Sequence, residues 1–340
     1  MRKIKIAQIG TSTVSHGDDI FYTLGTLPDI FEVVGYALPE NEREKFPERM
    51  ADFEGYREMT VEEILNDPEI EAVAVETEEI YLPKYAIMAA KAGKHIHMEK
   101  PGGIALSDFE ELIKIVKENG KVFHMGYMYR YNMYIKEILE RVKSGELGNI
   151  ISVEAQMSCY HPVKVREWLK TFPGGIMFFL GCHLIDMILQ MKGQPDRIIP
   201  LNKKTGTDGV DSEDFGMAVF EYKDGVSFVK TVASEIGGYA MRQLVVTGTK
   251  KTIELKPLEM FIPEIKYWMF SEKTEYESTD WSDRGVTVKS ENYSRYNGMM
   301  TSFAEMVAGE KENPYSPDYE LELYKTILKC CGDEEKCKRH

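Results

Sequence analysis

Short apolar runs alternate with amphipathic stretches through the first 126 residues of the chain. The runs have strand length, and the stretches between them repeat apolar residues at helical spacing. We expect strands at 3–9, 31–38, 71–75, 95–98 and 121–126, and helices at 18–27, 61–66, 83–92 and 107–119. Strands that alternate with helices favour a parallel sheet with right-handed crossovers. The first domain, residues 1–126, is therefore predicted to be a doubly wound α/β domain with a Rossmann-like parallel sheet.

The pattern changes after residue 126, where longer alternating runs follow one another. We expect helices at 131–144, 175–191, 298–308 and 317–331, and strands at 150–159, 214–222, 226–234 and 241–248. Lys223-Asp224-Gly225 supplies a tight turn between two of these strands. The polar segment 271–295 is predicted to be the least structured part. Residues 127–340 therefore form a predicted α+β domain with a largely antiparallel sheet, whose last helix is able to pack back on the first domain.

Composition excludes several classes of protein. The chain has 340 residues, 43% of them hydrophobic, and a formal net charge of -14. This acidity argues against nucleic-acid binding, which needs a basic face. The apolar runs are shorter than the ~20 residues that span a bilayer, and the first ten residues alternate like a strand rather than a signal peptide. A cytoplasmic protein that binds no membrane is expected.

The five cysteines do not form the pattern of a disulfide framework, so we expect reduced thiols. Cys330, Cys331, Cys337 and His340 gather near the C-terminus, and such a cluster is able to bind zinc. Adjacent cysteines on a helix point to different faces, however, and the end of a chain is often frayed. We therefore expect no metal site.

The tripeptide Glu99-Lys100-Pro101 directly follows the strand predicted at 95–98. Ligands of doubly wound domains bind at the carboxyl ends of the strands, and a proline after the lysine fixes the backbone and favours a cis bond in a tight turn. A surface Lys-Pro turn is the alternative interpretation. Position therefore makes Lys100 a candidate catalytic residue.

Several motifs together resemble the glucose-fructose oxidoreductase/inositol dehydrogenase family, often called Gfo/Idh/MocA. The most specific are AGKHIHMEKP at 92–101 and GCHLID at 181–186. Weaker matches are Ile9-Gly10, Gly126 with Arg130, GELG at 145–148, Gly174-Gly175, Glu213-Asp214-Phe215, VTGT at 246–249 and SFAE at 302–305. The resemblance covers nearly the whole chain.

The resemblance implies an NAD- or NADP-dependent oxidoreductase that acts on a secondary hydroxyl or carbonyl of a sugar, polyol or related cyclic compound. Lys100 would lie beside the nicotinamide ring and touch the substrate hydroxyl, and His183 would donate or accept the proton. Oxidation of an alcohol needs a group that removes the hydroxyl proton as hydride leaves, and histidine titrates nearest neutral pH. The two side chains are expected to share one crevice. Asp186 either orients the imidazole of His183 or caps its own helix face.

Further site residues follow from their places in the family's motifs. The expected cofactor-binding residues are Gly10, Thr11, Ser12, Thr13, Val14, Leu38, Thr77, Glu78, Glu99 and Lys100. The expected substrate-binding residues are Lys100, Tyr127, Arg130, Tyr160, Arg166, His183 and Asp186. Solvated-loop positions are the alternative for the tyrosines and arginines.

The chain departs from the family pattern at four places. Ser12 and Ser15 replace the second and third glycines of the phosphate loop, and Leu38-Pro39 stands where an acidic residue usually binds the adenosine ribose. Glu78-Glu79 puts two carboxylates where an anionic cofactor should pass, which would oppose binding. Phe179 replaces an aspartate one helical turn before His183 and should make its surroundings drier.

These departures keep two other functions open. One is a redox-silent relative that binds a sugar-like ligand or a partner protein without turnover. The other is bond cleavage through transient oxidation by a tightly held cofactor. The family also implies a homodimer or homotetramer formed through the sheet at 214–248. Its candidate contact residues are Phe215, Met217, Val219, Phe228, Val232 and Val245, unless the domain's own helices cover them.

Overall fold

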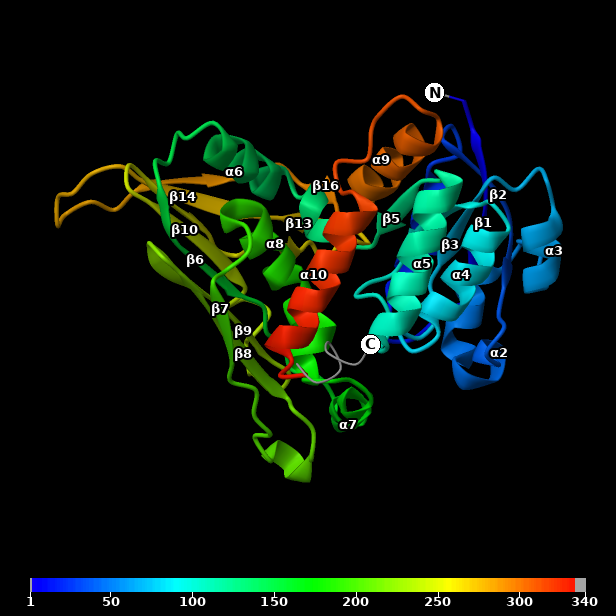
Figure 1. Cartoon of the computed structure of the whole chain (residues 1–340), viewed down its shortest axis with the longest axis horizontal. Coiled ribbons are helices and arrows are strands. Elements are labelled where there is room, and N and C mark those ends of the chain that lie inside the picture. Colours follow the sequence, from blue (N-terminus) through cyan, green and yellow to red (C-terminus); the bar gives the residue numbers. More distant parts are fainter. Residues whose placement is uncertain (1, 334–340) are drawn as a thin grey trace. The chain divides into compact units, whose positions relative to one another are not determined.

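The structure is a computed structural model in which residues 2–333 are described. The chain divides into two compact units (Figure 1). The first contains the residues up to Met128 together with Tyr296–Tyr324, and the second contains Tyr129–Arg295 together with the residues from Lys325 on. Sequence analysis assigned 296–324 to the second domain instead. Within residues 2–333, every helix is too short or too polar to cross a membrane.

A five-stranded parallel sheet forms the centre of the first unit, which confirms the predicted Rossmann-like fold. Its order is β2-β1-β3-β4-β5. The strands are β1 (Ile4–Ile9), β2 (Phe31–Ala37), β3 (Ala72–Val75), β4 (His95–Met98) and β5 (Phe123–Met125). All four residues of β3 are buried, as expected for a parallel sheet covered on both faces.

Two helix ends of this unit follow from capping residues in the sequence. The helices are α1 (Gly17–Thr26), α2 (Glu42–Lys45), α3 (Val61–Asn66), α4 (Leu82–Lys91), α5 (Leu106–Asn119) and α9 (Asn297–Val307). Thr60 and Glu63 form a capping box at the start of α3, and Gly120 ends α5 with φ 63°. Sequence analysis missed α2, which has only four residues.

The second unit is built on an eight-stranded sheet of order β15-β14-β11-β10-β6-β9-β8-β7. The strands are β6 (Ile150–Gln156), β7 (Arg197–Pro200), β8 (Phe215–Tyr222), β9 (Gly225–Val232), β10 (Gln243–Gly248), β11 (Thr252–Leu255), β14 (Glu272–Tyr276) and β15 (Val286–Lys289). The pairs are antiparallel except β6 with β9, which is parallel. The largely antiparallel sheet is therefore confirmed.

The helices of the second unit are α6 (Met133–Lys143), α7 (Val163–Trp168), α8 (Cys182–Lys192) and the end of α10 (Pro317–Cys330). Helix α8 packs on one face of β6 and β9, where alternate residues such as Ala155 and Val229 are buried. The other face carries the six apolar residues named above as candidate contacts, and all six are only partly buried.

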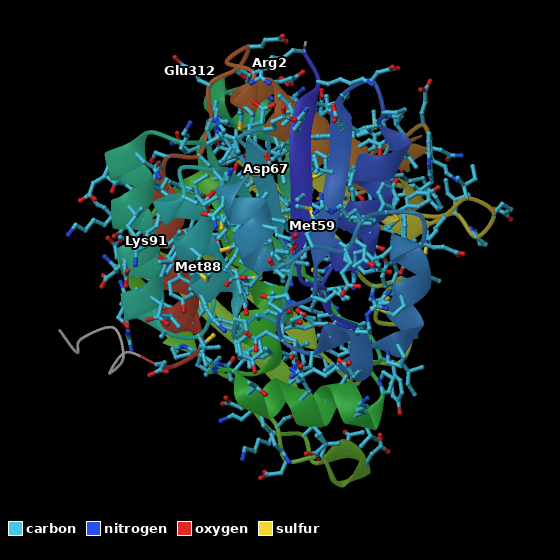
Figure 2. All side chains as sticks on the ribbon, turned by 90° about the vertical axis from the view of Figure 1, so that its right-hand side faces the viewer. Arg2, Met59, Asp67, Met88, Lys91 and Glu312 are labelled. Carbon is cyan, nitrogen blue, oxygen red and sulfur yellow. The ribbon has the colours of Figure 1, made fainter. Side chains whose placement is uncertain are left out.

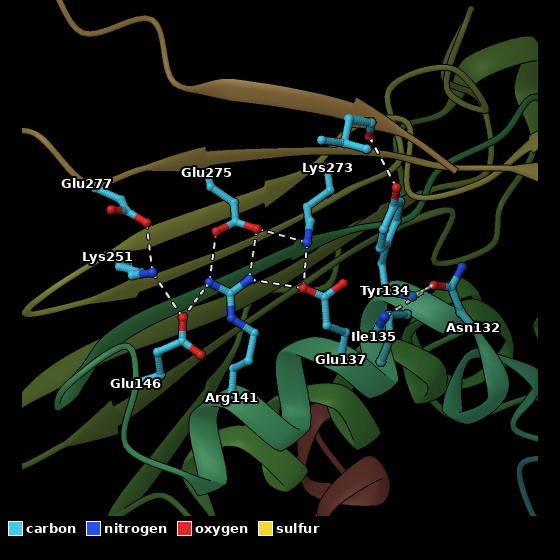
Figure 3. A network of polar contacts seen from close by, with 11 residues as sticks. Asn132, Tyr134, Ile135, Glu137, Arg141, Glu146, Lys251, Lys273, Glu275 and Glu277 are labelled. Carbon is cyan, nitrogen blue, oxygen red and sulfur yellow. Dashed lines mark hydrogen bonds and ion pairs between the residues drawn. The ribbon is translucent and has the colours of Figure 1, made fainter. Parts of the chain in front are cut away.

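The expectation that 271–295 is the least structured segment is wrong. It forms β14, β15 and β16 (Tyr293–Ser294), and β16 pairs with β13 (Trp268–Phe270), which in turn pairs with β12 (Met260–Phe261). The alternate residues Lys273 and Glu275 of β14 face the charged side chains Glu137 and Arg141 of α6 (Figure 3). Because this strand is anchored by ion pairs rather than by an apolar face, the apolar pattern did not reveal it.

Candidate active site

The loop after β1 makes a tight turn against the end of β3. Gly10 has φ 85°, and its N–H donates to the carbonyl of Ala37 at 2.7 Å. A Cβ on Gly10 would lie 2.2 Å from Cγ2 of Thr77. The buried Gln8 donates to the carbonyls of Gly10 and Gly17 at 3.1 and 2.9 Å. The first glycine of the phosphate loop is therefore required for space as well as for backbone conformation.

The two serines that replace the later glycines are both hydrogen-bonded within the loop. Ser12 Oγ accepts from the N–H of Val14 at 3.2 Å, and Ser15 Oγ accepts from the N–H of Gly17 at 3.3 Å. A Cβ on Gly17 would lie 3.1 Å from Cβ of Glu76. Gly17 thus permits the close approach of α1 to β3 that the family's third glycine usually permits. Sequence analysis missed Gly17, although its place at the first residue of the helix was the available signal.

The loop has features that suit a dinucleotide phosphate. Thr11 is fully buried, and its Oγ1 has no hydrogen-bond partner among residues 2–333. The loop leads into the N-terminus of α1, which favours anions. The two acidic residues of the first turn are engaged elsewhere: Asp18 pairs with Arg49, and Asp19 accepts from Tyr296 Oη at 2.6 Å. Thr11 to Val14 are the residues that would hold the pyrophosphate.

An acidic residue does stand near the end of β2, two positions beyond Leu38. Oε1 of Glu40 accepts from Lys84 Nζ at 2.7 Å and from Tyr85 Oη at 2.5 Å. Burial opposes ionisation of Glu40, but these hydrogen bonds outweigh it and hold the pKa of Glu40 below its usual range. Sequence analysis sought an acidic residue at positions 38 and 39 and did not consider Glu40.

A cavity of about 460 Å³ lies beside the end of β2. Leu38 and Pro39 line it, together with Met59 from the segment before α3 and Met88 from α4, both of which are labelled in Figure 2. Its volume is in the usual range for small-molecule pockets.

The two carboxylates expected to oppose the cofactor differ in their surroundings. Glu78 is paired with Lys45 at 3.3 Å. Glu79 is fully buried, and burial raises its pKa to about 8, although the charge of Lys100 and the residue's own backbone N–H act in the opposite direction. The expected electrostatic obstacle is therefore much smaller than the sequence suggests.

Lys100 is 1% exposed at the carboxyl end of β4, and its bond to Pro101 is cis. Its Nζ lies 3.7 Å from Oε1 of the buried Glu99, and Nδ1 of His16 lies 2.9 Å from the same oxygen. Burial alone would raise the pKa of Glu99, but His16 and Lys100 lower it to about 2. His16, which sequence analysis did not single out, thus links the loop after β1 to the carboxylate beside Lys100.

His183 lies in the first turn of α8 and is 1% exposed. Its ring meets that of Tyr129 edge to face, with centroids 5.3 Å apart. Residues Met177–Gly181 form a π-helix, however, so the α-helical i, i+4 relation assumed for Phe179 does not hold across this turn. The Phe179 ring packs near Trp168, at 5.3 Å between centroids.

Arg130 and Asp186, two of the expected substrate-binding residues, contact each other within the second unit. Arg130 donates twice to Asp186 at 2.9 Å, and Gln190 donates to Asp186 at 2.8 Å. Asp186 is thus a bidentate partner of Arg130, a role that sequence analysis did not anticipate.

Arg166 is fully buried and pairs with Asp208, which also accepts from the exposed Tyr160 at 3.3 Å. Tyr127, in the first unit, is buried.

No group of three or more histidine, cysteine, aspartate or glutamate side chains within residues 2–333 is arranged to hold a metal ion. Cys330 and Cys331 are buried free thiols, whereas Cys337 and His340 lie outside the described residues.

A parallel Rossmann-like sheet, a phosphate-type loop and a buried lysine at a strand end define the class of oxidoreductases that bind a nicotinamide dinucleotide. Two family models match the chain: residues 4–127 match the oxidoreductase family with an NAD-binding Rossmann fold, and 135–254 match the C-terminal domain of the same family. The chain belongs to the Gfo/Idh/MocA family.

Two curated relatives and one solved structure are similar to the chain. The chain is 32% identical over 142 residues to the uncharacterized oxidoreductase YhhX of Escherichia coli, covering 41% of this chain and 40% of that protein. It is 24% identical over 224 residues to the scyllo-inositol 2-dehydrogenase (NADP(+)) IolW of Bacillus subtilis, covering 65% and 61%. The solved UDP-N-acetylglucosamine 3-dehydrogenase GnnA of Acidithiobacillus ferrooxidans shares the fold with a TM-score of 0.75 at 16% identity, covering 100% of both chains. The alignments thus span less than two thirds of either curated relative.

Proposed function

We propose that the protein is an NAD(P)-dependent dehydrogenase or reductase that transfers hydride to or from a secondary hydroxyl or carbonyl of a sugar, polyol or related cyclic compound. The observation that carries this proposal is the buried Lys100 at the carboxyl end of β4 in an NAD-binding Rossmann domain. The bound nicotinamide supplies the hydride acceptor or donor. Related dehydrogenases that act on inositols support the substrate class.

Two side chains of this protein carry the remaining chemistry. Lys100, whose ammonium group has Glu99 as a carboxylate neighbour, contacts the reacting oxygen and stabilises negative charge that develops on it. His183 takes the hydroxyl proton in oxidation and returns it in reduction. Its dry surroundings exclude water from this proton transfer.

Titration of the purified protein with NAD⁺, NADH, NADP⁺ and NADPH is the first test, read by nicotinamide fluorescence and thermal stabilisation. We expect binding of at least one of the four. Failure of all four at millimolar concentration would favour a redox-silent relative instead.

A panel of sugars and polyols then tests the reaction. Lys100→Met should lower kcat by about 100-fold or more. Lys91→Met is the matched control, because Lys91 is an exposed lysine of α4 paired with Glu111, and it should leave kcat unchanged. Turnover without consumption of added cofactor would point to bond cleavage through transient oxidation.

We further propose that two copies associate through the uncovered face of the second unit's sheet. Support comes from Phe215, Met217 and Val219 of β8, which lie on the face opposite the buried Ala218 and Phe220 and remain partly exposed. A row of apolar side chains outside the core is a common feature of interfaces.

A further inference from the structure

Tyr129 is a buried phenol beside His183 for which the proposed reaction has no role. It lies just before α6, within the second unit. Its ring stands at 90° to the imidazole of His183, with the ring centroids 5.3 Å apart. This edge-to-face arrangement is a favoured geometry for two aromatic rings. One of the two rings here belongs to the residue to which we assign the proton transfer.

The phenol oxygen of Tyr129 is held in place by two buried charged residues. Its Oη donates to Oε1 of Glu259 at 2.5 Å and accepts from Nη1 of Arg242 at 3.2 Å. A phenol has one hydrogen to donate, so the donor and one acceptor position of the hydroxyl are both used. Burial raises the pKa of Tyr129, so the hydroxyl keeps its proton at neutral pH.

Glu259 is itself fixed by several donors. It accepts from Nη1 of Arg242 at 3.0 Å, from Nε of Arg295 at 2.9 Å and from Oη of Tyr239 at 3.3 Å. Arg242 also donates to the carbonyl of Ser158 at 3.3 Å. Burial opposes ionisation of Glu259, but the two arginines outweigh it and lower the pKa of this carboxyl. Arg242 directly precedes β10 and Arg295 directly follows β16, so strands hold the anchor of the phenol.

We propose that Tyr129 is a positioning residue for His183: its ring, pinned at the hydroxyl by Glu259, holds the plane of the imidazole for proton transfer. This inference rests on the proposed function, because that function assigns the proton to His183. A ring that is fixed by the main chain at one end and by its hydroxyl at the other cannot swing aside. Displacement of a reacting group by about 1 Å costs about 100-fold in rate, so even a small movement of this ring should be measurable. Tyr129 acts through His183 and does not itself touch the substrate.

NMR of the ligand-free protein tests the contact without any assay of activity. The protein is labelled at the imidazole carbons of its seven histidines, and the signal that disappears in His183→Asn identifies His183. We expect a nuclear Overhauser effect between this imidazole and the ring protons of Tyr129 in wild type. Its absence would overturn the inference, and this measurement does not require a Tyr129 variant that folds.

Tyr129→Phe removes the hydroxyl and keeps the ring. The ring loses its anchor, so we expect the NMR signal of His183 to move and to broaden. Tyr239→Phe is the matched control, since Tyr239 also donates to Glu259, but its ring stacks on Phe261, at 5.2 Å between centroids. This control should leave the His183 signal in place. An unchanged signal in Tyr129→Phe, or an equal shift in both variants, would overturn the inference.

Turnover of a substrate found in the panel of sugars and polyols tests the link to catalysis. Tyr129→Phe should lower kcat about tenfold and leave the Kd of the cofactor unchanged, whereas Tyr239→Phe should change kcat by less than about twofold. In the His183→Asn background, Tyr129→Phe should have no further effect on kcat, because the group that it positions is gone. An equal loss in that background would overturn the inference, since Tyr129 would then act on something other than His183.

Failure of the proposed function has a different signature. Absence of cofactor binding in wild type, or full turnover by His183→Asn, would refute the proposed function and with it the positioning role, even where the NMR contact is present. Cofactor binding and loss of turnover in His183→Asn, together with an unchanged kcat in Tyr129→Phe, would refute the positioning role alone.

Discussion

Replacement of His16 by phenylalanine tests the electrostatic description of the lysine site. Nδ1 of His16 lies 2.9 Å from Glu99, whose carboxylate is 1% exposed. Phenylalanine keeps a ring of similar size, so the packing with Tyr296, at 5.6 Å between ring centroids, is retained. The substitution therefore removes the close contact between a His16 ring nitrogen and a buried anion, and little else.

The structure sets the expected size of the effect. A fall in the pKa of Glu99 from 4.5 to about 2 corresponds to ~3 kcal/mol of stability, which His16 and Lys100 supply beyond the opposing effect of burial. Removal of one polar partner of a buried group costs about 1–3 kcal/mol on its own. Because Lys100 remains, we expect His16→Phe to lower the free energy of unfolding at pH 7 by about 2 kcal/mol.

Urea unfolding of wild type, His16→Phe, Glu99→Gln and the double variant measures this coupling. The pKa of Glu99 is depressed in the folded state, so its contribution is present above pH 4.5 and is lost as the pH falls toward 2. The cost of His16→Phe should shrink over the same interval. A cost below about 0.5 kcal/mol at pH 7, or an equal cost in the Glu99→Gln background, would refute the reasoning.

Three further predictions concern the cofactor and the assembly. Gly10→Ala should weaken cofactor binding at least tenfold by fluorescence titration, whereas Gly93→Ala, at φ 71° with nothing within 4 Å of the added Cβ, should leave binding unchanged; equal binding by both variants would contradict the role of Gly10. Because a carboxylate near the end of β2 repels a 2′-phosphate, NAD(H) should bind more tightly than NADP(H), and Glu40→Ala should narrow the difference; tighter binding of NADP(H) by wild type would count against this assignment. Met217→Asp should shift the molar mass by light scattering from dimer to monomer, whereas Tyr22→Asp, at an exposed position of α1 in the first unit, should not; an unchanged mass for Met217→Asp would place the interface elsewhere.

The sequence predicted the elements that are held together by apolar residues. Strands β1 to β5 are short and mostly buried, so their apolar runs are visible without an alignment. The same holds for β6 and for β8 to β10, where buried and partly exposed residues alternate. Lys100 could be identified as a candidate from the sequence because its motif directly follows one of these apolar runs.

The features that the sequence did not reveal depend on pairing between distant residues. Glu40, the acidic residue near the end of β2, is held in place by Lys84 and Tyr85 of α4. These partners lie more than forty positions along the chain, so the local sequence does not reveal them. The raised pKa of Glu79 follows from its complete burial, which a run of two glutamates in the sequence does not suggest. Local patterns report burial of apolar surface, whereas these contacts are fixed only by the folded chain.

The ion pairs beneath β14 have a practical consequence for handling the protein. Arg141 contacts Glu275 at 2.8 Å, Lys273 contacts Glu137 at 2.5 Å, and Lys251 bridges Glu146 and Glu277 (Figure 3). Concentrated electrolyte weakens such attractions while it strengthens apolar association. Molar sodium chloride should therefore weaken the attachment of β14 to α6 more than it weakens the packing of the other strands on their apolar face.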